Sequence, residues 1–404
     1  MTTVVVIVLL LVSLVGHGIL WLGLINRLHA TALARRPMRA VTGLFYCFLL
    51  GIPLLFFGVW FQGGEPFIDG LHRLPEAGAP YAVDVWQLYL IVAIVVAVLR
   101  GPVWAIDRAR HRPPAVVVEH RIESVDLAAV LGRYPVAGGR ARLFSRVPGN
   151  QMFRLDVDVE EVEMERLPPA LAGLSILHLS DFHFSLRITR DYFDEVVRIA
   201  NRLQPDLLAV TGDICDAAAR IDWIGPIFGE LVAPLGKYFV LGNHDIRLKK
   251  DVTRLRAALS AAGCVDLAAG PRSLEVRGQS VLLAGNERPW FPLAESTSAA
   301  LTGDGPKAFK ILLAHSPDQF PWARRHDFDL MLAGHTHGGQ ICFPGIGPVV
   351  CPSRHGIRYA SGTFVTGPTL MHVSRGVSSL FPLRLLCPPE MTKLVLHPAA
   401  ARPL

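Results

Sequence analysis

The sequence predicts an α/β domain preceded by three membrane-spanning helices. Apolar residues crowd into roughly the first hundred of the 404 positions, and charged residues become frequent only after Arg108. Beyond position 170, five short apolar runs each end in a cluster of Asp, His or Asn side chains. Stretches with helical spacing lie between some of these runs, and this alternation of strands and helices is typical of α/β folds.

Three apolar stretches are long enough to cross a bilayer, which takes about 20 residues of helix. They are residues 4–25, 41–61 and 85–106, and Arg100, Gly101 and Pro102 interrupt the third. A cleaved signal peptide is the alternative for the first stretch, but no basic segment precedes it and no clear small-residue cleavage site follows it. Three spans are too few for a typical transporter core, so we expect an anchor, with His17 as a neutral packing residue.

Loop charge predicts the orientation of these spans. The loop after the first span carries four arginines and no acid, whereas acids outnumber the single arginine in the loop after the second. Arginines follow the third span again. Because basic loops stay in the cytoplasm, we expect a multi-pass protein of the cell (inner) membrane, with everything after residue 106 cytoplasmic.

The chain after the third span divides into a linker and a soluble domain. Residues 107–150 are rich in Arg, Pro and Gly and are expected to form a juxtamembrane linker with some local structure. Residues 153–162 alternate apolar and polar side chains, which predicts a half-buried strand. Helical spacing follows at 192–203 and at 254–261. The predicted units are therefore the anchor 1–106, the linker 107–150 and a domain at 151–404.

Five apolar runs lead directly into polar residues. Each run has the length of a buried strand, and ligand sites of open α/β sheets lie beyond the carboxyl ends of the strands. The side chains after the runs are therefore expected to share one edge. The runs are residues 176–180, 207–210, 238–241, 311–314 and 330–333, and the polar residues are Asp181, His183, Asp213, Asn243, His315, His335 and His337.

These seven side chains are candidate metal ligands. A single transition-metal ion binds about four to six ligands, so seven donors suit two ions. Oxygen and imidazole donors without thiolate favour Mn, Fe, Zn or Co over a structural zinc. Two such ions can hold a phosphoryl group and activate water for attack on phosphorus. Taken singly, Asp-x-His, Gly-Asp and Gly-Asn are ordinary turn sequences, but their repetition after five apolar strands makes coincidence a poor explanation.

The order of these residues resembles a known signature. The series Asp181-x-His183, Gly212-Asp213-x-x-Asp216, Gly242-Asn243-His244-Asp245, Ala314-His315 and Gly334-His335-x-His337 is similar to the five blocks of calcineurin-like metallophosphoesterases. The resemblance covers about residues 174–340, and segments 338–341, 374–376 and 387–390 resemble a bacterial, membrane-associated branch. It implies a four-layer α/β/β/α sandwich within residues 151–404, with two metals at the strand ends.

The resemblance also implies a role for each residue. One metal would be held by Asp181, His183, Asp213 and His337, and the other by Asp213, Asn243, His315 and His335. His244 would face the substrate and stabilise or protonate the leaving oxygen. Asp245 would orient that imidazole and Asp216 would support the bridging region, with helix or turn capping as an equal alternative for both.

Two segments depart from the common family pattern. Phe184 to Arg187 stands where glycine often follows the first histidine, and 285–290 stands where many relatives carry an acidic turn. Both could reshape substrate access. Arg187, Arg288 and Trp290 are therefore candidates for the substrate rim, although a solvated surface is the ordinary position of an arginine.

Together these features predict a dinuclear-metal-dependent phosphoester hydrolase, a phosphatase or phosphodiesterase, in which a metal-bridging hydroxide attacks phosphorus. Its membrane anchor makes a lipid-linked phosphoester the candidate substrate. A nuclease is the first alternative, but the net charge of +6 is small and no basic stripe with interleaved aromatics is present, so no nucleic-acid partner is expected. A metal-binding sensor or scaffold is the second alternative, and the complete ligand set argues against it.

The six cysteines are scattered and are expected to be free thiols.

Overall fold

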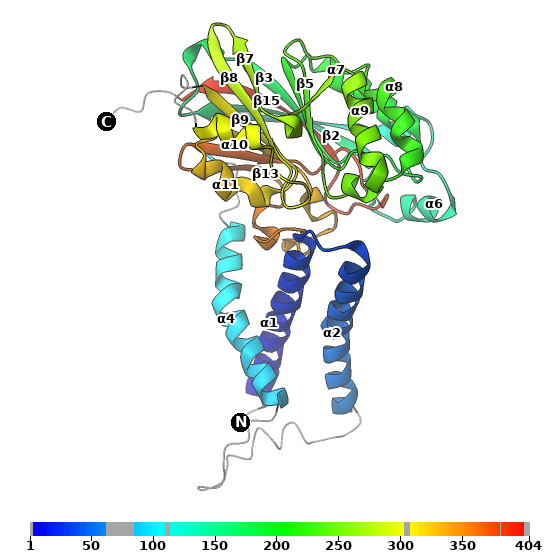
Figure 1. The fold of residues 1–404 in the computed structure, drawn as a ribbon. Helices are drawn as coiled ribbons and strands as arrows, with labels where there is room; N and C mark the ends of the chain where they lie inside the picture. The colour runs from blue at the N-terminus through cyan, green and yellow to red at the C-terminus, as the bar shows by residue number, and fades with distance from the viewer. Residues whose placement is uncertain (1–2, 62–84, 110–113, 303–307, 380, 400–404) are drawn as a thin grey trace. The chain divides into compact units, whose positions relative to one another are not determined.

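The chain forms two compact units, residues 1–112 and 113–404, in a computed structural model that describes residues 3–61, 85–109, 114–302, 308–379 and 381–399 (Figure 1). Within the described residues, the first unit contains α1 (Thr3–His29), α2 (Arg35–Phe61) and α4 (Val85–Ala109). Each of them is long and apolar enough to cross a membrane, and α4 runs without a break through Pro102. The loop 62–84, whose acidic residues enter the orientation argument, lies outside the described residues.

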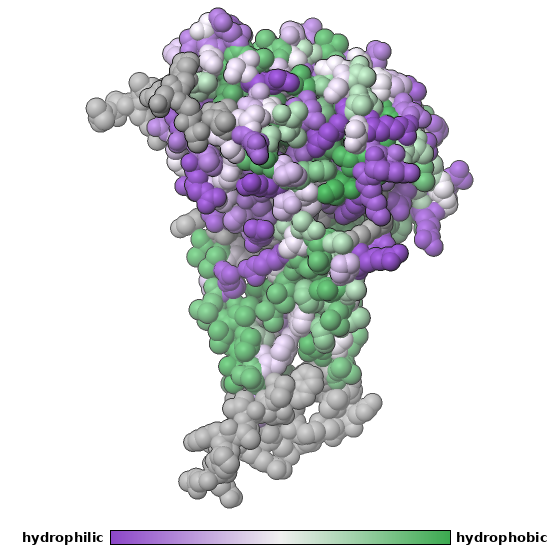
Figure 2. Space-filling view, viewed as in Figure 1, coloured by the Kyte–Doolittle hydropathy of each residue, from purple (hydrophilic) through white to green (hydrophobic). Residues whose placement is uncertain are grey.

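The helices of the first unit pack through a small residue and a polar contact. A Cβ on Gly16 of α1 would overlap the carbonyl of Ala93 on α4, so the absence of a side chain allows these helices to approach closely. His17, expected as a packing residue, is buried and contacts the Tyr89 hydroxyl and, at 2.9 Å, the Leu49 carbonyl. Apolar side chains cover the outside of these helices, as lipid surroundings require (Figure 2).

The second unit contains two mixed sheets. The first has the order β1 (Val117–Asp126), β2 (Arg154–Met164), β15 (Glu390–Pro398), β3 (Leu174–Leu179), β4 (Leu207–Thr211), β5 (Lys237–Val240), β6 (Cys264–Asp266). The second has the order β13 (Gly362–Thr366), β14 (Thr369–Val373), β10 (Leu330–Ala333), β9 (Phe309–Ala314), β8 (Gln279–Asn286), β7 (Arg272–Val276). A separate hairpin pairs β11 (Cys342–Phe343) with β12 (Gly347–Pro348).

Short helices connect the strands. The α-helices are α5 (Leu127–Val130), α6 (Gly139–Ser145), α7 (Arg190–Arg202), α8 (Ile224–Phe228), α9 (Val252–Ala261), α10 (Glu295–Thr302) and α11 (Phe320–Arg325). The 3-10 turns are η1 (Pro169–Leu171), η2 (Ala218–Trp223), η3 (Asp245–Asp251), η4 (Leu267–Ala269), η5 (Pro317–Gln319), η6 (His337–Gly339) and η7 (Gly356–Tyr359). The two stretches with helical spacing correspond to α7 and α9.

The predicted four-layer sandwich is confirmed by three apolar cores. Side chains alternate along each strand, so Leu177 and Leu208 face α7, α8 and α9 while Ile176 and Leu207 face the other sheet. A third core joins the outer face of the second sheet to α11. Strands buried on both faces read as continuous apolar runs, which is why the sequence pattern revealed them.

Two expectations are modified by the structure. Residues 117–126, expected within a linker, form the edge strand β1, which pairs antiparallel with β2. Most of β1 is exposed, so its sequence lacks the apolar alternation of a packed strand. The five polar clusters also come from two sheets rather than one, because β3, β4 and β5 belong to the first and β9 and β10 to the second.

Candidate metal centre

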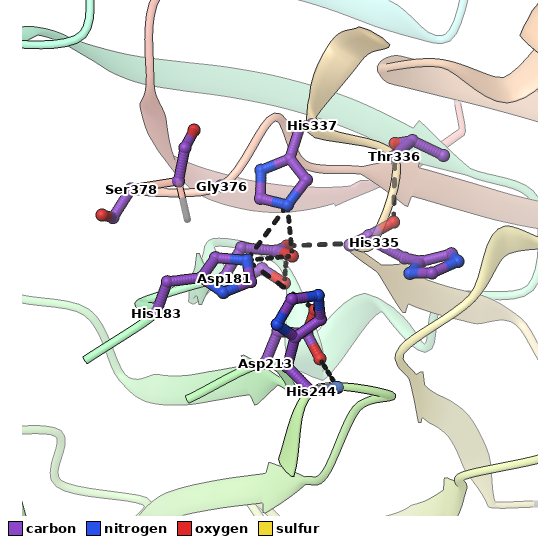
Figure 3. Close-up of polar contacts among 12 residues, drawn as sticks. Asp181, His183, Asp213, His244, His335, Thr336, His337, Gly376 and Ser378 are labelled. Atoms are coloured by element: carbon purple, nitrogen blue, oxygen red, sulfur yellow. Dashed lines mark hydrogen bonds and ion pairs between the residues drawn. The ribbon is translucent and has the colours of Figure 1, made fainter. Parts of the chain in front are cut away.

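The strand ends bring the predicted ligands together. Strands β3, β4 and β5 are mutually parallel, and so are β9 and β10, so within each sheet the carboxyl ends of these strands meet at one edge. Figure 3 shows the side chains of Asp181, His183, Asp213 and His337 pointing toward one another from these ends. The seven predicted ligands therefore occupy one buried or half-buried cluster.

Five of the seven hold an unusual backbone conformation. Their φ angles lie between 49° and 74°, in the left-handed region that residues other than glycine rarely adopt. Each such residue costs about 1–3 kcal/mol and persists only where the surroundings impose it, commonly at functional sites. The five are Asp181, His183, Asp213, His335 and His337.

The first donor group contains Asp181, His183, Asp213 and His337, with one donor atom of each within 4.8 Å of the others. His183 Nε2 lies 3.7 Å from Asp181 Oδ1 and 3.7 Å from Asp213 Oδ2. His337 Nε2 lies 3.2 Å from Asp181 Oδ1 and 3.1 Å from His183 Nε2. The converging atoms are carboxylate oxygens and imidazole nitrogens, which are metal donors.

The second donor group contains Asp213, His315 and His335, again within 4.8 Å. His315 Nε2 lies 3.3 Å from Asp213 Oδ1 and 3.1 Å from Asn243 Oδ1. Asp213 is common to both groups, because its Oδ1 faces His315 while its Oδ2 faces His183. This division agrees with the two ligand sets that the family resemblance implies.

The donor atoms fit divalent cations. Asp181 Oδ1 and His335 Nε2 are buried and form no hydrogen bond within the part of the chain that the structure describes. A buried polar atom without a partner is costly, and a cation is the partner that suits an oxygen beside imidazoles. His315 Nδ1 donates to the Thr211 carbonyl at 2.6 Å, which leaves Nε2 as the coordinating atom.

Two glycines of the motifs are required by close approach. A Cβ on Gly242 would collide with Asp213 Oδ1 and would lie 2.7 Å from His315 Nε2. A Cβ on Gly334 would lie 2.5 Å from Asp181 Oδ2. The Gly-Asn and Gly-His dipeptides therefore allow the ligands to pack against bare backbone, in addition to turning the chain.

Burial and neighbouring charges shift the pKa values of the histidines in the cluster in different directions. Burial disfavours the imidazolium of His315, yet the neighbouring Asp213 carboxylate raises the pKa of that imidazole to about 9. Burial and the proximity of His315 hold the pKa of His335 well below its ordinary value. Metal binding needs deprotonated imidazoles, so a cation entering this cluster would displace protons.

His244 occupies the open side of the cluster. Its side chain is 14% exposed, its Nδ1 contacts Asp216 Oδ1, and its backbone NH donates to Asp213 Oδ1 at 2.7 Å. Asp216 Oδ2 also accepts from His183 Nδ1 at 2.9 Å. Asp216 therefore orients two imidazoles, and His244 Nε2 is left 4.0 Å from Asp213 Oδ2.

Asp245 does not orient His244, contrary to expectation. Its Oδ1 accepts from the backbone NH groups of Ile214 and Cys215 at 3.0 and 2.9 Å, and its Oδ2 accepts from Gly242 at 2.8 Å. The carboxylate thus joins the loops that follow β4 and β5. Capping of local backbone, the alternative from the sequence, describes this residue better.

The three rim candidates lie in different places. The Trp290 ring is 5.4 Å from the His315 ring and 4.9 Å from the His335 ring, so it borders the cluster. The Arg187 guanidinium lies 4.7 Å over the Phe381 ring. Arg288 is exposed, and its backbone is held by Asn286 and Gln319.

Sequence reasoning missed two arginines beside the site. Arg384 is fully buried, and its Nη2 lies 3.1 Å from His337 Nδ1 and donates to the Ser378 carbonyl at 2.6 Å. It stands far beyond the motifs, so no spacing signal revealed it. Arg247 Nη1 lies 2.6 Å from His244 Nε2, and the three-residue spacing on a helical segment could have indicated this contact.

Comparison with known proteins supports this reading of the site. The family profile described as calcineurin-like phosphoesterase matches residues 174–339. The uncharacterized metallophosphoesterase YkuE of Bacillus subtilis is 32% identical over 248 residues, which are 58% of this chain and 83% of that protein. Phosphodiesterase YaeI of Escherichia coli is 30% identical over 235 residues, 56% of this chain and 83% of that protein. A Bos taurus transmembrane protein with a metallophosphoesterase domain is 32% identical over 265 residues, 60% of this chain and 57% of its own length. The chain belongs to the calcineurin-like metallophosphoesterase family.

Proposed function

We propose that the chain is a dinuclear-metal-dependent phosphoester hydrolase that acts at the membrane. One observation carries the proposal: Asp213 is shared by two donor groups, and each group contains a buried atom without a hydrogen-bond partner among the described residues, Asp181 Oδ1 and His335 Nε2. One ion at each group would satisfy both atoms. The ligands would be Asp181, His183, Asp213 and His337 for one ion, and Asp213, Asn243, His315 and His335 for the other.

The chemistry divides between the ions and the protein. Two bound divalent ions, Mn, Fe, Zn or Co, would neutralise phosphoryl oxygens and lower the pKa of a water molecule for in-line attack on phosphorus. The protein orients the reaction. Asp216 accepts from Nδ1 of His244. When both ring nitrogens of His244 are protonated, the Nε2 proton would pass to the leaving oxygen. Trp290, beside His315 and His335, bounds the substrate position on the second donor group's side.

The membrane unit supports a substrate at the bilayer surface. The Escherichia coli relative is named a phosphodiesterase and the bovine relative a transmembrane protein, which is consistent with phosphoester hydrolysis beside a membrane. We propose a lipid-linked phosphate or diphosphate as the substrate. Arginines without any acid stand at the end of α1 and the start of α2, which supports a cytoplasmic position of the second unit at the inner membrane.

The test is hydrolysis of para-nitrophenyl phosphate and bis-para-nitrophenyl phosphate by the full-length protein in detergent. We expect release that requires added manganese, is abolished by chelator and is lost in Asp213→Asn. The matched control is Asp194→Asn, which changes an exposed aspartate on α7 and should retain activity. No release with any metal, from folded protein that binds two ions, would favour the sensor or scaffold alternative.

A further inference from the structure

Three segments of the second unit contain no acidic residue. Segments 127–155, 182–190 and 330–389 contain no Asp or Glu, but they carry five, two and four arginines respectively. An ordinary soluble surface mixes both signs of charge, so such long acid-free segments that converge in space indicate an anionic partner.

These segments meet around α6. The Phe144 ring packs against the Phe381 ring at 6.0 Å, and Arg187 lies over the same ring. Asn150 Nδ2 donates to the carbonyls of Phe144 and Pro382 at 3.0 and 2.8 Å. Helix α6 and the 381–386 loop therefore form one continuous surface, which we call the basic apolar face and define by Arg140, Arg142, Leu143, Arg146, Phe381 and Leu386.

The basic apolar face combines exposed apolar side chains with unpaired cations. Leu143 is 69% exposed, Leu386 57% and Phe381 47%, although all three are large apolar residues. Its three arginines are exposed and form no ion pair with any residue that the structure describes. Arginine next to protruding Leu and Phe is the composition of segments that lie in a membrane interface.

The basic apolar face borders the metal centre. Gln340, three residues after His337, donates through Nε2 to the carbonyls of Phe381 and Leu383 at 3.3 and 2.9 Å. Arg384, from the same loop, reaches His337 Nδ1. A surface that contacts the loop carrying Phe381 and Leu386 is therefore brought next to the metal ligand His337.

We propose that the basic apolar face docks on the anionic surface of the bilayer that holds the chain's own helices, and that docking presents a lipid-linked phosphoester to the metal centre. The substrate part rests on the proposed function, whereas the docking part does not. The tether keeps the second unit at high local concentration near the bilayer. Each arginine near an anionic surface adds about a factor of five in affinity, and insertion of Leu143, Phe381 and Leu386 selects the orientation.

The docking test is hydrogen exchange of the full-length protein, one copy per nanodisc, in phosphatidylcholine and in an equal mixture with phosphatidylglycerol. Peptides covering α6 and residues 381–387 should exchange more slowly in the anionic discs. A peptide containing Val232, an exposed apolar residue bonded to Asn201 at the end of α7, should not change. The Arg140→Gln/Arg142→Gln/Arg146→Gln variant should lose this protection, because docking weakens roughly a hundredfold.

Several outcomes would overturn the docking part. Equal exchange in both lipids would exclude an anionic bilayer as the partner. Protection in detergent that increases with protein concentration would assign the face to a second copy of the chain. Protection that appears with added RNA but not with anionic lipid would assign it to nucleic acid.

Turnover tests the substrate part separately. The triple variant should hydrolyse para-nitrophenyl phosphate at the wild-type rate, but phosphatidate in the disc roughly a hundredfold more slowly at low enzyme occupancy of the surface. Equal phosphatidate hydrolysis by wild type and variant, or hydrolysis of the soluble ester alone, would overturn the presentation of lipid substrate. Failure of both esters in the wild type would instead refute the proposed function and leave the exchange result standing.

Discussion

At the scale of single residues, Asp216 determines how two imidazoles point. Its oxygens contact Nδ1 of His183 and Nδ1 of His244, so each ring turns its Nε2 toward the cluster or its opening. A hydrogen bond at one imidazole nitrogen fixes the state of the other, which is how ligand and acid–base histidines are commonly tuned. His183 lies in the first donor group, whereas Nε2 of His244 lies outside that group, 2.6 Å from Arg247 Nη1.

This arrangement separates the effects of two substitutions. We expect His244→Asn to lower kcat about 10²–10⁴-fold, as for loss of a general acid, with metal content unchanged. Asp216→Asn should lower both kcat and metal affinity, the latter about 10–100-fold, because His183 loses its orienting partner. Kinetics with the para-nitrophenyl esters and metal analysis of the purified proteins measure both effects. Full activity of His244→Asn would refute its role as the acid.

Close packing of ligands against glycine makes a second prediction at this scale. Gly242→Ala should abolish or strongly reduce manganese binding, because the added methyl group collides with Asp213 and His315. Gly225→Ala is the matched control, since a Cβ there meets nothing within 4 Å. Calorimetric titration with manganese compares the two variants. Unchanged affinity in Gly242→Ala would mean that the glycine serves only the turn.

The residues that sequence reasoning found share one property: they stand within one to four positions of an apolar strand. All seven predicted ligands and His244 do so, and they lie together in the structure, while their role in binding metal stays a prediction. Arg384 reaches His337 from 47 positions downstream, and such a contact depends on tertiary packing alone. Of the two alternatives for Asp245, its contacts with backbone NH groups favour capping, because adjacency in sequence to His244 does not determine where the carboxylate points.

At the scale of elements, the last strand joins distant parts of the first sheet. Strand β15 lies between β2, to which it is parallel, and β3, to which it is antiparallel. Its first residue, Glu390, contacts the guanidinium of Arg375, which follows β14 of the other sheet. Arg375 also lies 3.1 Å from Asp156 on β2. One ion-pair network therefore connects the two sheets.

Removal of the Glu390 charge from this ion-pair network should destabilise the second unit. Glu390→Gln is expected to lower the free energy of unfolding by about 3–5 kcal/mol, because it leaves a largely buried guanidinium without its main counter-ion. Burial alone would raise the pKa of Glu390, but Arg375 holds the pKa below its ordinary value. A lowered pKa gives stability that is present above the unfolded value of about 4.3 and is lost as the pH falls below it.

Thermal unfolding of wild type and Glu390→Gln at pH 7 and at pH 3.5 measures the difference. We expect the difference in unfolding free energy between the two proteins to narrow at the lower pH, because Glu390 of the unfolded wild-type chain takes up a proton there. Glu230→Gln is a control, since Glu230 is an exposed acid in a loop of the same unit. If the difference in unfolding free energy did not change with pH, the stability that the network contributes would not depend on the charge of Glu390.

The elements that the sequence predicts are those with a regular pattern of buried apolar residues. Strands packed on both faces can be recognised in the sequence as apolar runs, and α7 and α9 can be recognised by the helical spacing of their apolar residues. Strand β1 escaped because most of its residues are exposed, so pairing with β2 leaves no apolar pattern. The assignment of β3 and β9 to different sheets could not come from local pattern either, since both read as continuous apolar strands.

At the scale of the whole molecule, metal binding should act on one unit only. The buried cluster combines Asp181 and Asp213 with four imidazoles, and Asp181 Oδ1 and His335 Nε2 form no hydrogen bond with the described residues. A cation that binds the folded unit alone stabilises it by about 2.7 kcal/mol at a free concentration a hundred times Kd. The three helices of the first unit contain none of the candidate ligands, so their stability should not respond.

Hydrogen exchange of the full-length protein, with manganese and with chelator, can follow both units in one sample. Peptides from β3, β4, β9 and β10 should open less often with manganese, by roughly a hundredfold at that concentration, whereas peptides from α1 and α4 should exchange equally in both conditions. Asp213→Asn, which removes the oxygen pair common to both donor groups, should lose the response of the strands.

If manganese protected the strands equally in Asp213→Asn, the ions would bind elsewhere and the shared-carboxylate centre would be refuted. If manganese also slowed exchange in the helices, the two units would unfold together. The division between residues 112 and 113 would then describe how the chain packs, but the two parts would not be independently stable.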